Sequence, residues 1–182
     1  MTRLVGFAGS LRAGSYNRAL LAAAAHAMPA GSTLDVLSID EVPLYNADLE
    51  ESQGVPARVQ TIKNAIATAD GLVIATPEYN GGIPGVAKNV VDWISRPGED
   101  QPRVTRGKPV ALMGATPGGL GTAFSQAAWL QVLRTLRMRV WVDGGPFYVS
   151  SAFNSFDEQG EANTELKERL SSYLRAFVDS LG

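Results

Sequence analysis

The sequence predicts one doubly wound α/β domain that is built on a parallel sheet and spans residues 1–182. Two observations predict this fold class. Short apolar runs of strand length alternate with longer stretches of helical periodicity, and the run Gly71–Thr76 is apolar almost throughout, as in a strand covered by helices on both faces. A chain of 182 residues is long enough to bury a full core in a single domain.

The first predicted strand is a short apolar run that begins at Leu4 and leads into the glycine-rich segment Gly9–Asn17. Glycines let the backbone approach a ligand closely, the short side chains of Ser10, Ser15 and Asn17 supply hydrogen-bond donors, and Arg12 supplies a permanent charge. An alanine-rich helix follows, so its free N–H groups would point at the same anion. The alternative is an ordinary strand-to-helix turn with a Ser or Asn cap.

Two well-known phosphate loops do not match this segment. Gly9 and Gly14 have the spacing of the P-loop, but Ser15 and Tyr16 stand where that pattern needs Lys and Ser or Thr. The dinucleotide pattern G-x-G-x-x-G is also absent after the first strand. The segment therefore favours a phosphate monoester, held by neutral donors and one arginine.

Periodicity and turn residues predict the remaining elements, which alternate along the chain. Pro56 opens a helix whose apolar positions recur every three or four residues. The segments Pro43–Leu49 and Arg96–Gly107 are expected to be surface connections. The other expected elements are the helices Ala19–Met28, Val86–Ser95, Thr122–Arg137 and a last helix with the buried stripe Leu166, Leu170, Tyr173, Phe177 and Leu181, and the strands Thr33–Ile39, Gly71–Thr76, Lys108–Gly114 and Arg139–Val142.

Five strands with helical crossovers suggest the flavodoxin-like strand order 2-1-3-4-5. In such sheets, ligands bind beyond the carboxyl ends of the strands. The loops Gly9–Asn17, Pro77–Gly85 and Ala115–Gly121 follow the first, third and fourth strands, and all three are rich in glycine. The sequence therefore predicts one crevice lined by these three loops.

Composition excludes several classes of function. A net charge of -2 gives no basic surplus for nucleic acid, and the absence of cysteine removes disulfides, thiolate nucleophiles and zinc-thiolate sites. No apolar stretch reaches the length of a membrane span or of a signal-peptide core. We therefore expect a cytoplasmic protein with no membrane or nucleic-acid partner.

Two long motifs, Gly9–Asn17 and Pro77–Trp93, make the chain resemble the NAD(P)H-dependent FMN reductase family, which includes quinone, chromate and azo-dye reductases. The resemblance covers nearly the whole chain. It implies FMN as cofactor and NAD(P)H as co-substrate. By position it implies that the first loop binds the phosphate and the other two loops hold the ring; the implied residues are Ser10, Arg12, Ser15, Tyr16, Asn17, Pro77, Glu78, Tyr79, Asn80, Gly81 and Thr116.

A flavin carries its own chemistry, because its ring accepts hydride and the protein positions it. No catalytic side chain and no metal site are therefore expected. His26 is interpreted as a surface or packing residue, and Glu78 as a loop carboxylate whose backbone matters more than its side chain. Trp93, Trp129 and Trp141 are interpreted as core or subunit-contact residues.

The resemblance also implies a homodimer, possibly a dimer of dimers, with a contact near Leu44, Tyr45 and Trp93. The electron acceptor is expected to be a small molecule that takes the place of NAD(P)+. A non-enzymatic electron carrier like flavodoxin is the main alternative, but Arg12 and the open glycines favour an enzyme. A phospho-acceptor domain is a weaker alternative, because Asp70 precedes its strand instead of following it.

Overall fold

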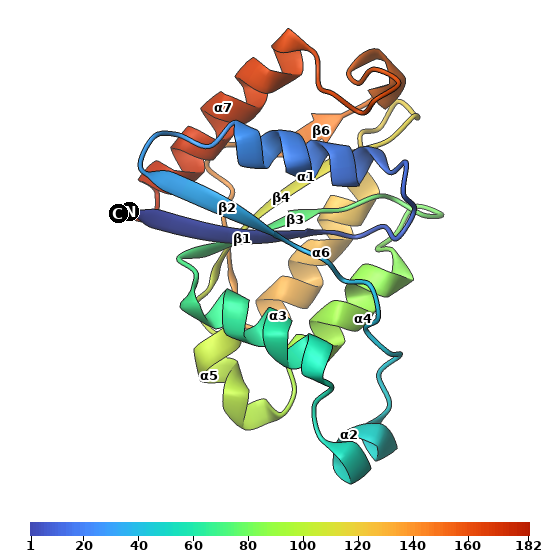
Figure 1. Ribbon diagram of the computed structural model, residues 1–182, viewed down its shortest axis with the longest axis vertical. Coiled ribbons are helices and arrows are strands. Elements are labelled where there is room, and N and C mark those ends of the chain that lie inside the picture. Colours follow the sequence, from blue (N-terminus) through green and yellow to red (C-terminus); the bar gives the residue numbers. More distant parts are fainter.

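The computed structural model describes all residues, 1–182, and holds one parallel sheet in the order β2-β1-β3-β4-β5, as the sequence predicts (Figure 1). A sixth strand pairs with β4 beyond β5. The strands are β1 Thr2–Ala8, β2 Ser32–Leu37, β3 Gly71–Ala75, β4 Pro109–Ala115, β5 Arg139–Val140 and β6 Phe147–Val149. The helices are α1 Tyr16–His26, α2 Ala47–Gln53, α3 Ala57–Thr68, α4 Gly85–Ile94, α5 Gln101–Val104, α6 Ala123–Thr135 and α7 Thr164–Asp179.

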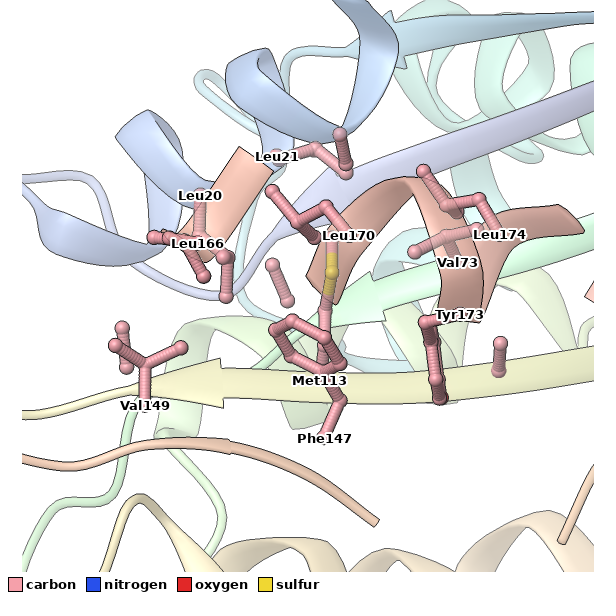
Figure 2. Packing of buried hydrophobic residues seen from close by; sticks show 14 of the residues in the cluster. Leu20, Leu21, Val73, Met113, Phe147, Val149, Leu166, Leu170, Tyr173 and Leu174 are labelled. Atoms are coloured by element: carbon pink, nitrogen blue, oxygen red, sulfur yellow. The ribbon is translucent and has the colours of Figure 1, made fainter. Parts of the chain in front are cut away.

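Helices cover both faces of the sheet, and strand residues divide between them with a period of two. Helices α1 and α7 cover one face, and α3 to α6 cover the other (Figure 1). On β3, Val73 and Ala75 belong to the core on the side of α1 and α7, whereas Leu72 and Ile74 belong to the core on the side of α3 to α6. Figure 2 shows leucines of α1 and α7 meeting around Met113 on the first of these faces. No helix combines the length and the apolar character that a membrane span requires.

The fifth strand is shorter than the predicted Arg139–Val142 because the chain leaves the sheet after Val140. Gly145 adopts a left-handed φ of 70° and Pro146 has no N–H to donate, so the chain cannot continue the ladder there. It returns as β6, beside Met113–Ala115. In the gap, the Tyr173 hydroxyl donates to the Leu112 carbonyl at 2.8 Å and replaces a strand partner.

Both predicted surface connections contain helices. Asn46 caps α2 by accepting a hydrogen bond from the Asp48 N–H at 2.9 Å, although α2 has no buried residue. The connection Arg96–Gly107 holds a 3₁₀ turn, Gly98–Asp100, and the short α5, and its Val104 is completely buried. Most of this segment is exposed or half-buried, so it is a surface connection as expected, but its helical turns and its buried Val104 were not predicted.

The tryptophans belong to the core, which is the first of the two interpretations that the sequence allows. Trp93 and Trp129 are completely buried, and the Trp93 indole N–H donates to the Pro43 carbonyl at 2.7 Å. Trp141 packs against Tyr173 and Phe177 at ring-centre distances of 4.9 and 5.2 Å. Trp93 is therefore not available as a subunit-contact residue.

Candidate functional site

Three loops meet beyond the carboxyl ends of the central strands. They are loop 1 (Gly9–Ser15), loop 2 (Thr76–Pro84) and loop 3 (Thr116–Thr122). Backbone hydrogen bonds of the sheet extend into the first residues of loops 1 and 2. The Gly9 N–H donates to the Ala75 carbonyl at 2.8 Å, and the Thr76 N–H donates to the Met113 carbonyl at 2.8 Å. The loops are therefore fixed relative to one another by the sheet, which explains how residues far apart in the sequence can form one site.

Loop 1 places hydroxyl and cationic groups at the start of α1. Ser15 is the N-cap of this helix and accepts a hydrogen bond from the Asn17 N–H at 3.2 Å. Ser10 is buried, and Arg12 is exposed and has no carboxylate partner. Free N–H groups at a helix start favour an anion, and a guanidinium adds to this preference. Loop 1 thus has the donors that the sequence predicts for a phosphate.

Two residues of the predicted phosphate site make contacts that the sequence does not reveal. The Asn17 side chain is buried, donates to the Ala115 carbonyl at 2.8 Å and accepts from the Ala115 N–H at 2.9 Å. It therefore connects α1 to the end of β4. The Tyr16 ring packs against Phe156 at a centre distance of 5.7 Å, so its side chain contributes to packing while its backbone N–H lies in the first turn of α1.

Loop 2 folds back on itself in a tight turn. Asn80 and Gly81 have left-handed φ values of 53° and 71°, and Tyr79 and Gly82 exchange backbone hydrogen bonds at 3.1 and 3.3 Å. The dipeptide Asn-Gly is typical of this mirror-image turn. The Tyr79 hydroxyl donates to the Ser10 Oγ at 3.1 Å. Loops 1 and 2 are therefore in direct contact, as one shared site requires.

Hydrogen bonds with groups of α6 hold loop 2 in place. The Thr76 hydroxyl lies 2.8 Å from the Ser125 hydroxyl and accepts from the Trp129 indole N–H at 2.9 Å. The Glu78 carboxylate accepts from the backbone N–H groups of Phe124 and Ser125 at 2.8 and 3.1 Å. A carboxylate at a helix start is stabilising. The Glu78 side chain therefore anchors loop 2 to α6, a contact that the emphasis on its backbone missed.

Loop 3 has a fixed start and an exposed middle. The Thr116 N–H donates to Val149 at 3.0 Å, and the Thr116 hydroxyl accepts from the Gly118 N–H at 3.3 Å. Leu120 is 56% exposed, and a Cβ added at Gly119 would meet no atom within 4 Å. The middle of loop 3 is therefore open to solvent.

The residues of loop 1 fit the phosphate of FMN. The donor set of Ser10, Arg12 and Ser15 suits a phosphate monoester, since hydroxyls and a guanidinium both donate to its oxygens. A Cβ added at Gly14 would lie 3.2 Å from an Arg12 guanidinium nitrogen, so glycine leaves this cradle free. Bound FMN would supply the hydride chemistry.

Sequence reasoning missed the buried support of the site and the far wall of its groove. Thr76, Ser125 and Trp129 gave no signal, because each hydrogen bond joins residues about 50 positions apart. A surface groove of about 710 Å³ runs along loop 1 to Val36–Asp40 and to the turn Asp157–Glu161. Its lining does not include Tyr79–Gly81 or Thr116. His26 lies exposed at the last residue of α1.

The chain is similar in sequence to known FMN and quinone reductases. The sequence profile of the family described as NADPH-dependent FMN reductase matches residues 2–154. An NAD(P)H-dependent FMN reductase of Pseudomonas aeruginosa is 40% identical, with 96% of this chain and 92% of the relative covered. A 2-hydroxy-1,4-benzoquinone reductase of a Burkholderia species is 36% identical, with 94% and 89% covered.

The fold is similar to that of a solved flavoenzyme structure. A flavoenzyme NAD(P)H:(acceptor) oxidoreductase from Paracoccus denitrificans superposes with a TM-score of 0.87 at 28% identity, covering 100% of this chain and 97% of that one. The chain is an oxidoreductase that uses FMN as cofactor and NAD(P)H as co-substrate, and the alternative of a non-enzymatic electron carrier is not favoured. The chain belongs to the NADPH-dependent FMN reductase family.

Proposed function

We propose that the three loops form the FMN site, with the phosphate at loop 1 and the ring over loops 2 and 3. The observation that carries this proposal is the direct contact of loops 1 and 2 through Tyr79 and Ser10, which joins the cationic cradle to an open surface. In this arrangement Arg12 and the serine hydroxyls bind the phosphate. The Asn80–Gly81 turn offers backbone groups to one edge of the flavin ring, and Thr116 lies at the opposite side of the ring.

The chain's own residues orient the reactants and leave one face open. No side chain at the site is needed as a nucleophile or a base, because hydride moves directly between stacked rings. A Cβ added at Gly81 would meet no atom within 4 Å, and one at Gly82 would meet only the Tyr79 carbonyl at 3.8 Å. This space admits one planar molecule at a time, first NAD(P)H and then the electron acceptor.

A quinone is the acceptor class that the relatives favour, since one relative is a 2-hydroxy-1,4-benzoquinone reductase and others are quinone reductases. Because donor and acceptor use the same face, double-reciprocal plots at several quinone concentrations should be parallel, as in a ping-pong reaction. Intersecting lines would show a ternary complex and would contradict a single shared face.

The absorption spectrum of the purified protein tests the proposal. A bound flavin should give its yellow absorption, and anaerobic NADH or NADPH should bleach it. Titration with FMN, riboflavin and FAD should give the tightest binding for FMN. Equal affinity for riboflavin, which lacks the phosphate, would contradict the role of loop 1.

A second chain is proposed to wall the open side of the site. Leu44 is 80% exposed and Tyr45 is 36% exposed, and both lie next to α4, where the Tyr45 N–H donates to Asn89 at 2.8 Å. An exposed leucine beside an ordered aromatic ring suits a two-fold contact. Sedimentation should show a dimer or a dimer of dimers, and Leu44→Asp should shift it toward monomer. A fully active monomer would contradict this proposal.

A further inference from the structure

The groove along loop 1 is larger than one phosphate needs. Its volume of about 710 Å³ falls in the range of about 300–1,000 Å³ typical of small-molecule sites. The groove begins at the cradle and continues to the end of β2, away from loops 2 and 3. A flavin ring over those two loops would therefore leave most of this groove free.

Two arginines line the groove, and only one of them belongs to loop 1. Arg12 and Arg18 both line it, and neither forms an ion pair with a carboxylate. The single contact of the Arg18 guanidinium is a long one of 3.4 Å to the Leu11 carbonyl. A guanidinium has five donors, so Arg18 can bind a further phosphate beside the one at loop 1.

The wall at the end of β2 combines an apolar surface with a positioned carboxylate. Val36 is 54% exposed. The Ser38 hydroxyl donates to one Asp40 carboxylate oxygen at 2.7 Å and accepts from the Asp40 N–H at 3.1 Å, which fixes the side chain and leaves its other oxygen free. In dinucleotide-binding sheets, an acidic side chain downstream of the phosphate loop accepts hydrogen bonds from the ribose hydroxyls.

We propose that this groove binds the adenosine diphosphate half of NADH while FMN occupies loop 1, an assignment that rests on the proposed function. Arg18 contacts the pyrophosphate, Val36 lies against the adenine, and Asp40 accepts from the ribose hydroxyls. Four carboxylates also line the groove; they are Asp40, Asp157, Glu158 and Glu161. A 2′-phosphate would replace one of the ribose hydroxyls that Asp40 accepts from, and repulsion by this carboxylate makes the chain prefer NADH to NADPH.

Calorimetric titration of the FMN-loaded protein with ADP-ribose tests the proposal without turnover. ADP-ribose should bind without releasing FMN, and Asp40→Asn should weaken it about tenfold, the usual effect of losing a hydrogen bond to a charged group. Glu41→Gln is the matched control, because Glu41 is the next residue and does not line the groove. It should leave the affinity unchanged. 2′-Phospho-ADP-ribose should bind about tenfold more weakly than ADP-ribose, and Asp40→Asn should narrow that difference.

The alternative results separate this inference from the proposed function. If ADP-ribose does not bind while NADH still bleaches the flavin, the groove assignment is overturned and the proposed function stands. Release of FMN by ADP-ribose would show that ADP-ribose competes for the FMN phosphate site at loop 1 and would overturn the proposal. Tighter binding of FAD than of FMN would show that the groove binds the adenylate half of FAD instead. Failure of both NADH and NADPH to bleach the flavin would overturn the proposed function itself.

Discussion

The floor and the rim of the candidate site are built differently. The floor, Asn17, Thr76, Glu78 and Ser125, uses its hydrogen-bonding groups on other parts of the protein. The rim includes the exposed residues Arg12, Tyr79, Asn80 and Leu120, of which Tyr79 is 50% exposed. Floor residues therefore set where the loops lie, and rim residues keep groups free for a ligand. Substitutions in the floor should lower stability, and substitutions in the rim should lower affinity.

The largest effect is expected in the floor, for Asn17→Leu. This change leaves the Ala115 N–H and carbonyl buried without partners and should lower the free energy of unfolding by about 2–6 kcal/mol, since each of the two unsatisfied groups costs about 1–3 kcal/mol. Urea denaturation of the FMN-free protein measures it. The rim variant Arg12→Ala is the control and should change stability by less than about 0.5 kcal/mol. Similar losses in both variants would remove the distinction between floor and rim.

The next effect is expected in the rim, for Arg12→Ala. It should weaken FMN binding by about 1.5–3 kcal/mol, because the guanidinium forms charge-assisted hydrogen bonds with the phosphate. Fluorescence titration of the FMN-free protein gives the dissociation constant. Arg175→Ala, on the exposed face of α7, should leave that constant unchanged, and riboflavin binding should respond little to either change. Unaltered FMN affinity in Arg12→Ala would exclude Arg12 from the site.

A buried charge outside the site extends the comparison. The completely buried Lys63 donates to the Arg96 carbonyl and lies 2.6 Å from an Asp100 carboxylate oxygen, and this hydrogen bond, with one from Arg103, holds the pKa of Asp100 below its usual range. A folded pKa below the unfolded value of about 3.9 stabilises the protein above that pH. This stabilisation is lost as the pH falls through the folded pKa.

Asp100→Asn should therefore destabilise the protein at pH 7 by about 1 kcal/mol, a modest value because the pair is partly open to water. The difference from the wild type should begin to shrink below about pH 4, where the Asp100 carboxylate of the unfolded chain becomes protonated, and should disappear as the pH falls through the lower folded pKa. Denaturant midpoints of the wild type and the variant at pH 7 and pH 3 measure the destabilisation and its decrease at low pH. Asp92→Asn, which breaks the exposed pair with Lys88, is the control with a smaller expected effect. A pH-independent difference would assign the loss to packing instead of charge.

The sequence predicted the features that depend on local patterns. Pro56 precedes α3, the stripe at Val59, Ile62 and Ile66 is buried, and the apolar run at Gly71 is β3, as expected. The Asn-Gly pair at position 80 forms its typical turn within the predicted loop.

Features that depend on distant contacts could not be predicted. Beside the break between β5 and β6, the Leu112 carbonyl accepts from the Tyr173 hydroxyl, which is 61 residues away from Leu112 along the chain. The Asn17 amide meets a strand end 98 residues away. The sequence of helix α2 shows no apolar periodicity because none of its residues is buried. The groove wall at Val36–Asp40 follows from how β2 ends beside loop 1, which no short motif in the sequence encodes.

The smallest effect is expected for Glu78→Gln, a change in the floor. The glutamine oxygen can still accept from the Phe124 and Ser125 N–H groups, so the variant loses only the favourable charge at the start of α6, worth about 0.3–1 kcal/mol of stability. Turnover should stay close to that of the wild type, because water at an open site can protonate a reduced quinone. Glu78→Ala, which removes both hydrogen bonds, should lose more stability and bind FMN less tightly. A fall in turnover of about 100-fold or more in Glu78→Gln with FMN still bound, the size expected for the loss of a general acid, would instead place Glu78 among the catalytic residues.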